Sequence, residues 1–264
     1  MAAADGTPRP LERAGEAAYR LLGRLAEWTG LHRLFPGRPE ARADREDIPP
    51  PQGEPRLWLH AGTRVGLDTA RPIVRAWLRR HPEGRVLLTV ISDEARREAT
   101  ELPEPRTTVA YLPTDTPAAA RHFLAAAAPT TALCLGPGLW PTLSRALGRA
   151  GVPWLWLVGS YFPAPWRWAR RLPLIYRPTL ARPERVLLGL AEDRDAVRAL
   201  GIPDDRIAVT GSPLLDAPRQ ADPAGGRRLR AALQGRPILV FEATEAGEEE
   251  LLAGVCRQLP APFT

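Results

Sequence analysis

Short apolar runs alternate with longer amphipathic segments along most of the chain. Runs that are apolar throughout are typical of strands covered on both faces, and their alternation with helices predicts a parallel, doubly wound α/β sheet. The predicted strands are 57–60, 85–90, 107–111, 131–135, 154–158, 185–189 and 207–209. The predicted helices are 68–81, 92–100, 117–128, 140–150, 163–180 and 191–200.

Two segments precede this alternating region. Between Leu11 and Leu34, leucines, Tyr19 and Trp28 recur at roughly helical spacing among arginines. Such a basic amphipathic helix can lie on an anionic membrane surface or pack against its own domain, and the sequence leaves both alternatives open. Residues 36–55 are charged and rich in proline, so we expect a connector without regular structure.

A shorter region follows the last predicted strand. A linker rich in Pro, Gly and Ala over 212–226 precedes a helix at 227–233, a strand at 237–241 and a helix at 247–259. One strand with its helices is too little for a domain, so we expect the stub of a truncated one. The predicted parts are an amphipathic helix over 1–35, a linker over 36–55, a Rossmann-like domain over 56–211, and a linker with a stub over 212–264.

The composition describes a folded, basic protein. Of 264 residues, 44% are hydrophobic, which is enough for a large core. All 36 basic residues are arginine against 30 acidic ones, and the net charge is +6. A GC-rich coding bias would produce this Arg-only set, although a basic surface attracts phosphate on nucleic acid, lipid or nucleotide alike. Since the chain contains no recognizable nucleic-acid-binding module, we expect no nucleic-acid partner.

Several chemistries are not indicated. Cys134 and Cys256 are far apart, and neither has a Cys or His at metal-ligand spacing, so we expect no metal and no cofactor. Glycine-rich nucleotide loops and nucleophile elbows are missing too. The N-terminus lacks the order of a signal peptide, and no run of about 18 apolar residues occurs. We expect a cytoplasmic protein, with peripheral contact to the inner membrane face as the alternative.

Five landmarks then identify a family resemblance. They are Trp58-Leu-His60-Ala61, Tyr111-Leu-Pro-Thr-Asp115, Leu139-Trp140-Pro141, Val209-Thr-Gly211 with Asp216, and Gly247-Glu248-Glu-Glu250. In this order the chain resembles the 3-deoxy-D-manno-octulosonic acid (Kdo) transferases. The resemblance implies a two-domain GT-B fold, of which this chain holds the N-terminal domain and the start of the second. It also implies transfer of Kdo from CMP-Kdo to a lipid A precursor.

The resemblance assigns roles to individual residues. In the family a glutamate at the turn after His-Ala is the presumed general base, and here that turn carries Thr63, Gly66 and Leu67. Leucine cannot accept a proton, so Asp68 or His60 would have to substitute for the base. The implied acceptor-binding residues are Thr63, Arg64, Gly66, Asp115 and Trp140. The implied remnant of the donor side is Thr244, Gly247 and Glu248.

Simpler interpretations of the same residues exist. His60 at a strand end is also typical of a buried, satisfied histidine; Asp115 can cap a helix, and Glu248 favours a helix N-terminus without any ligand. The family's second acidic site is replaced by Gly136 and Gly138. Two hypotheses therefore remain: a transferase with a substitute base and a donor domain supplied by a second chain, or a non-catalytic scaffold that binds lipid or a partner.

A tryptophan- and arginine-rich segment stands apart from these landmarks. Within 152–176, four tryptophans are interleaved with arginines. The segment can bind an anionic lipid headgroup, or its tryptophans can pack in the domain core, and both alternatives stay open.

Overall fold

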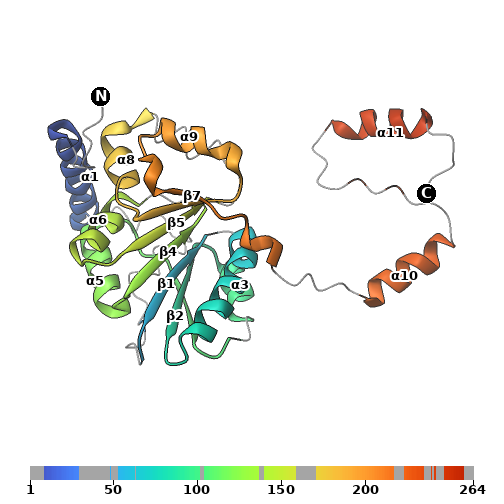
Figure 1. Cartoon of the computed structure of the whole chain (residues 1–264), viewed down its shortest axis with the longest axis horizontal. Helices are drawn as coiled ribbons and strands as arrows, with labels where there is room; N and C mark the ends of the chain where they lie inside the picture. Colours follow the sequence, from blue (N-terminus) through green and yellow to red (C-terminus); the bar gives the residue numbers. More distant parts are fainter. Residues whose placement is uncertain are drawn as a thin grey trace. The chain divides into compact units, whose positions relative to one another are not determined.

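The structure is a computed structural model. It describes residues 9–29, 48, 53–62, 64–101, 104–136, 140–158, 171–216, 223–234, 239, 241 and 247–258. In this part of the chain, a sheet of seven parallel strands has the order β3-β2-β1-β4-β5-β6-β7 (Figure 1). The strands are β1 (Arg56–Ala61), β2 (Arg85–Val90), β3 (Thr107–Tyr111), β4 (Thr131–Leu135), β5 (Trp154–Val158), β6 (Arg185–Leu188) and β7 (Ile207–Val209). The predicted doubly wound α/β fold is confirmed.

Helices cover both faces of this sheet, and each face has its own apolar core. One core contains side chains of α3 (Arg64–Arg80) and α4 (Asp93–Thr100). The other contains side chains of α5 (Pro117–Ala127), α6 (Pro141–Arg149), α8 (Pro173–Leu180) and α9 (Arg194–Ala199). Successive residues of β1 alternate between the two: Leu57 and Leu59 pack with α3, and Trp58 packs with α5 and α6. This alternation explains why the strands are mostly apolar on both faces.

Several helix boundaries differ from the predictions. α3 begins at Arg64 rather than at Asp68, because Leu67 is buried on the same side as Ala70 and Val74 and so extends the helix toward its N-terminus. The predicted helix 191–200 is divided into a short 3-10 turn, η2 (Ala191–Asp193), and α9. Of the predicted helix 163–180, residues up to 170 lie outside the described part. The tryptophans at 166 and 168 lie there as well.

Two further 3-10 turns lie on either side of β7. These are η3 (Asp204–Arg206) and η4 (Pro213–Asp216). The chain divides into two compact units, Met1–Ala217 and Pro218–Thr264, so the boundary falls at 217/218 where the sequence predicts 211/212. The second unit contains α10 (Pro223–Leu233) and α11 (Glu248–Gln258), and α10 begins inside the predicted linker. Of the predicted strand 237–241, only Leu239 and Phe241 are described, and neither is in a strand.

The N-terminal helix belongs to the first unit. α1 (Pro10–Thr29) runs along α8 and also contacts α5 (Figure 1). Its backbone approaches α8 closely at Gly15, where an added Cβ would lie 2.8 Å from the Leu174 carbonyl oxygen. Gly23 makes a second close approach, with 3.2 Å between an added Cβ and Cδ of Pro117 at the start of α5. The helix therefore packs against its own domain, one of the two predicted alternatives.

Candidate acceptor site

The candidate site lies at the carboxyl ends of β1 and β4. These two strands are neighbours, while the chain continues from β1 to β2 on one side and from β4 to β5 on the other. Open parallel sheets bind ligands at such a reversal of strand order, in the crevice outside the strand ends. The described residues that follow these strands are Gly62 after β1 and Gly136 after β4. Neither supplies a side chain, so the chemistry depends on the residues around them.

His60 lies directly beneath this edge. Its side chain is 1% exposed, and its Nδ1 lies 3.0 Å from the Thr89 hydroxyl, which also accepts a hydrogen bond from Trp58 Nε1 at 2.9 Å. Burial lowers the pKa of His60 to about 3. The ring is therefore neutral near pH 7, and an imidazole with so low a pKa is a weak base. In this position His60 acts as a packing and hydrogen-bonding residue.

Trp140 covers the other side of the imidazole. The two rings meet edge to face, with 4.5 Å between their centroids. Trp140 occupies the N-cap position of α6, so it joins the loop after β4 to His60, the second-last residue of β1. At Gly62 an added Cβ would lie 3.1 Å from His60 Nε2. The floor of the site is thus close-packed, and Trp140 is half-buried within it.

The first turns of α3 bring more polar groups to the edge. Arg64 is the first residue of the helix, and its side chain is 77% exposed, with one nitrogen 3.8 Å from Glu98 Oε1. Asp68 lies one turn further on, is 46% exposed and lies 3.6 Å from Arg71 Nε. Gly66 is half-buried between them, and Thr63 lies outside the described residues. Arg64 and Asp68 are therefore a cation and a carboxylate that a ligand at this edge can reach.

Asp115 has a different environment from the one expected of a ligand-binding carboxylate. It accepts hydrogen bonds from the backbone N–H groups of Thr142 (3.1 Å) and Leu143 (2.8 Å), and from the Tyr19 hydroxyl (3.0 Å). Burial raises the pKa of Asp115 to about 6, although all three hydrogen bonds act in the opposite direction. Asp115 thus caps α6, directly after Trp140, and holds α1 against it.

Comparison with known proteins places this architecture in a family. A model of the 3-deoxy-D-manno-octulosonic-acid transferase (kdotransferase) N-terminal region matches residues 36–217. The chain belongs to the 3-deoxy-D-manno-octulosonic-acid transferase family. It is 31% identical over 220 residues to the 3-deoxy-D-manno-octulosonic acid transferase of Bordetella pertussis, a match that covers 81% of this chain and 49% of that protein. The chain therefore spans about half the length of this relative.

Solved structures support the fold. Anabaena Alr3699/HepE in complex with UDP has a TM-score of 0.54 at 12% identity, covering 78% of this chain and 58% of that one. The S. aureus MnaA–UDP co-structure has a TM-score of 0.52 at 15% identity, covering 77% and 58%. At these identities the likeness concerns the fold alone, and it agrees with the Rossmann-like, GT-B type of domain that the sequence predicts.

Leu67 stands where the resemblance to the Kdo transferases implies a general base. Leu67 is 1% exposed and packs in the core between α3 and the sheet. Its side chain therefore does not line the edge where Arg64 and Asp68 are exposed. Of the two substitute bases that the sequence suggests, Asp68 is accessible and His60 is not.

The residues that the resemblance implies for the donor side belong to the second compact unit, which is described by itself. Gly247 precedes α11 with a φ of +100°, a conformation that favours glycine, and its N–H donates to Glu249 Oε2 at 2.8 Å. Glu248 is the first residue of α11 and is exposed. Thr244 lies outside the described residues.

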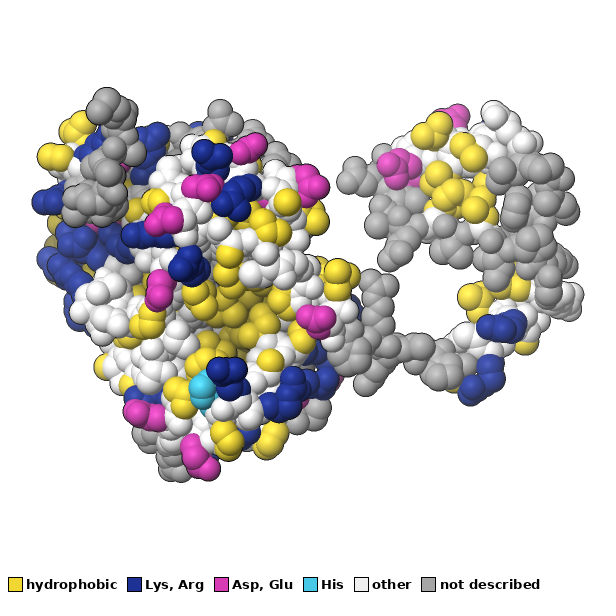
Figure 2. Space-filling view, viewed as in Figure 1, with side chains coloured by type: hydrophobic (Ala, Val, Ile, Leu, Met, Phe, Trp, Pro, Cys, Tyr) yellow, Lys and Arg dark blue, Asp and Glu magenta, His cyan; other side chains and the backbone are white. Residues whose placement is uncertain are grey.

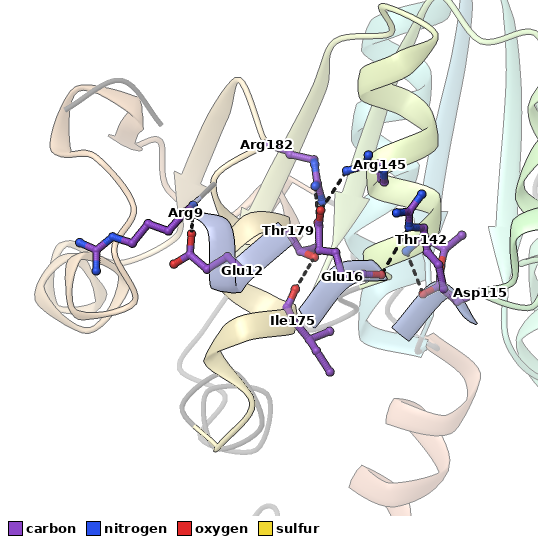
Figure 3. A network of polar contacts seen from close by, with 10 residues as sticks. Arg9, Glu12, Glu16, Asp115, Thr142, Arg145, Ile175, Thr179 and Arg182 are labelled. Carbon is purple, nitrogen blue, oxygen red and sulfur yellow. Dashed lines mark hydrogen bonds and ion pairs between the residues drawn. The ribbon is translucent and has the colours of Figure 1, made fainter. Parts of the chain in front are cut away.

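A polar network that the sequence analysis did not predict lies between α1 and the sheet domain (Figure 3). Glu16 is 2% exposed and forms ion pairs with Arg145 on α6, at 2.9 Å, and with Arg182 just after α8. Glu27 Oε1 accepts a hydrogen bond from Ala118 N–H at the start of α5, at 2.8 Å. The sequence feature that could have predicted this contact is the pair of glycines at 15 and 23. Their spacing marks a helix face that another element approaches closely.

Proposed function

We propose that this chain acts in lipopolysaccharide assembly as the acceptor-side part of a Kdo transferase. The family match over residues 36–217 carries the proposal, because that segment contains the sheet and the edge described above. In this role the phosphorylated lipid A precursor lies at the carboxyl ends of β1 and β4. Arg64, exposed at the start of α3, contacts one of its anionic groups.

The transfer itself requires a base and a donor. Asp68 is the substitute base that we propose, since it is exposed on the same helix as Arg64 and has a single weak ion-pair contact to Arg71 in the described part of the chain. CMP-Kdo would be held by a donor domain, of which residues 247–250 form a part and a second chain supplies the rest. The protein would work at the inner face of the membrane that contains its lipid acceptor.

A non-catalytic scaffold is the second candidate. Two observations favour it: His60 is buried with a lowered pKa, and Leu67 occupies the core where the resemblance implies a base. Such a protein would bind the lipid acceptor, or a working transferase, without transferring Kdo.

One experiment separates the two candidates. The purified protein is incubated with CMP-Kdo and a lipid A precursor, with and without the donor half of a Kdo transferase, and the lipid is analysed by mass spectrometry. The transferase proposal predicts a product that gains one Kdo and that is lost in Asp68→Asn but kept in the control Asp195→Asn, whose side chain is 93% exposed on α9. Lipid binding without product under every condition would favour the scaffold.

A further inference from the structure

A cavity of about 290 Å³ lies at the amino ends of β1, β2 and β3, on the face of the sheet that α5 covers. The candidate acceptor site lies at the other ends of the strands. Since a strand rises about 3.3 Å per residue, the two ends of the six-residue β1 are about 17 Å apart. Cavities that bind small molecules in proteins have volumes from about 300 Å³ upward, so this one has room for a small ligand.

The floor of the cavity is mostly apolar and is formed by one row of residues across the sheet. Trp58 on β1 is aligned with Leu87 on β2, which is aligned with Thr108 on β3. Ala127 at the end of α5 borders the same space. Trp58 is buried, Leu87 is half-buried and Thr108 is exposed. The cavity is therefore closed beneath Trp58 and open toward the edge strand β3, where a ligand can enter.

Three arginines form a second row, two residues before the first. Arg56 and Arg85 are aligned at the starts of β1 and β2, and Arg106 directly precedes β3. Since side chains two residues apart in a strand point to the same face, this row borders the cavity together with the apolar one. None of the described residues that line the cavity is acidic. The rim of the cavity is therefore positively charged.

The protein itself holds two of these arginines in place. Arg106 donates hydrogen bonds to four backbone carbonyls at the end of α3 and in the turn that follows, and it forms no ion pair in the described part of the chain. Arg56 donates to the Ala128 carbonyl and lies 3.2 Å from Glu54, which is 69% exposed. Carbonyl groups orient a guanidinium without cancelling its charge, so the rim is a preorganised cationic surface.

Elsewhere on the surface, charges of both signs are mixed. Over much of the face shown in Figure 2, dark blue and magenta side chains lie near one another. Arg198, for example, lies 3.6 Å from Asp195 and 3.5 Å from Asp204. A rim with three arginines and no acidic lining residue among those described differs from this pattern. Its position beside an apolar floor favours a ligand that is both anionic and partly apolar.

We propose that this cavity binds a small amphipathic anion, in which a carboxylate or phosphate is attached to a compact apolar body. The apolar body lies on Trp58 and Leu87, and the anionic group accepts hydrogen bonds from guanidinium groups of the rim. Inorganic phosphate would leave the floor unused, and a neutral apolar compound would leave the rim unused. The site is distinct from the proposed acceptor site, and its occupation does not depend on whether the chain transfers Kdo.

Isothermal titration calorimetry of the full chain with three compounds tests both parts of the site. The compounds are 1-naphthyl phosphate, 1-naphthol and inorganic phosphate. 1-Naphthyl phosphate should bind at least about tenfold more tightly than either of the others, because it alone contacts both the floor and the rim. Binding of 1-naphthol or of inorganic phosphate as tight as that of 1-naphthyl phosphate would overturn the proposal, as would no detectable binding of 1-naphthyl phosphate.

Charge variants test whether the compound binds in the cavity. Arg85→Gln removes a cation of the rim and should weaken 1-naphthyl phosphate binding about tenfold, whereas Arg80→Gln at the exposed end of α3 should leave it unchanged. An equal loss in the two variants would indicate nonspecific attraction to a basic protein and would overturn the proposal. Arg64→Gln should also bind the compound as the original chain does. A loss in Arg64→Gln would instead assign the compound to the candidate acceptor site.

A further variant fills the cavity. Thr108→Phe places an aromatic ring over the apolar floor from an exposed position on an edge strand, where aromatic residues are favourable. It should weaken 1-naphthyl phosphate binding at least about tenfold, and the control Thr100→Phe at the exposed end of α4 should not. Thermal unfolding checks that each variant is folded. Unchanged binding by a folded Thr108→Phe would overturn the proposal, and the Arg85→Gln comparison decides if Thr108→Phe does not fold.

Discussion

The face of α1 that packs on the sheet domain, its inner face, differs in its use of charged residues from the edge at the carboxyl ends of β1 and β4, which we call the acceptor edge after its proposed role. Beneath α1, buried or half-buried carboxylates at Glu16 and Asp115 are satisfied by arginines, a tyrosine and the N-terminus of α6. At the acceptor edge, by contrast, His60 is neutral and buried, and Arg64 and Asp68 are exposed with weak partners. The buried, paired carboxylates hold α1 on the sheet domain. The exposed, weakly paired Arg64 and Asp68 are the charged residues that a ligand can reach.

The largest effect should come from the buried carboxylate. Glu16→Ala would leave Arg145 and Arg182 without their partner, and breaking a buried ion pair in this way costs about 4 kcal/mol. Urea unfolding, followed by tryptophan fluorescence, measures the loss. The control Asp195→Asn removes an exposed carboxylate and should change stability by less than about 0.5 kcal/mol. Similar values for the two variants would show that α1 contributes little to the domain.

The strands of the sheet could be predicted from the sequence, whereas the orientation of α1 could not. The seven strands could be predicted because their apolar runs are long enough to define a sheet covered on both faces. The orientation of α1 could not, because a hydrophobic pattern shows where the apolar stripe lies and not what it faces. Glu16 is one charged residue among many until Arg145 and Arg182 are brought to it by the fold.

The acceptor edge shows the same limit. The sequence places His60 at a strand end, where a ligand contact and a buried histidine are equally consistent with the pattern. What separates them is the packing of Trp140 and the hydrogen bond to Thr89, both of which come from distant parts of the chain. Likewise, the sequence alone does not show that Leu67 is buried in the first turn of α3, which begins at Arg64 rather than at the predicted Asp68. Position along the sequence predicts the edge, and tertiary contacts decide which residues are accessible there.

A second, smaller effect depends on pH. The pKa of Asp115 is raised from 3.8 to about 6, so the folded state binds a proton more tightly than the unfolded state. The contribution of Asp115 to stability is therefore greatest below about pH 4 and is lost as pH rises through about 6, by at most about 3 kcal/mol. In Asp115→Asn this dependence should disappear. Unfolding of both proteins at pH 4 and pH 7 gives the difference, and a constant offset between them would contradict the assignment.

The smallest of these effects concerns the glycines of the inner face. Gly15→Ala would place a Cβ 2.8 Å from the Leu174 carbonyl oxygen, so overpacking should outweigh the better helix propensity of alanine and destabilise the protein by about 1 kcal/mol. Gly148→Ala on α6 meets no atom within 4 Å and should stabilise it by about 0.5 kcal/mol or more. Changes of the same sign in the two thermal unfolding curves would argue against the close approach of α1 and α8.

The central claim is that the acceptor edge, and Arg64 in particular, binds the lipid acceptor. The most direct measurement is the affinity of the full chain for a detergent-dispersed lipid A precursor. We predict that Arg64→Gln weakens binding about tenfold through loss of a charge-assisted hydrogen bond, and that Arg79→Gln on the same helix leaves it unchanged. Equal affinities for the two variants, or no binding by the parent protein, would contradict the account.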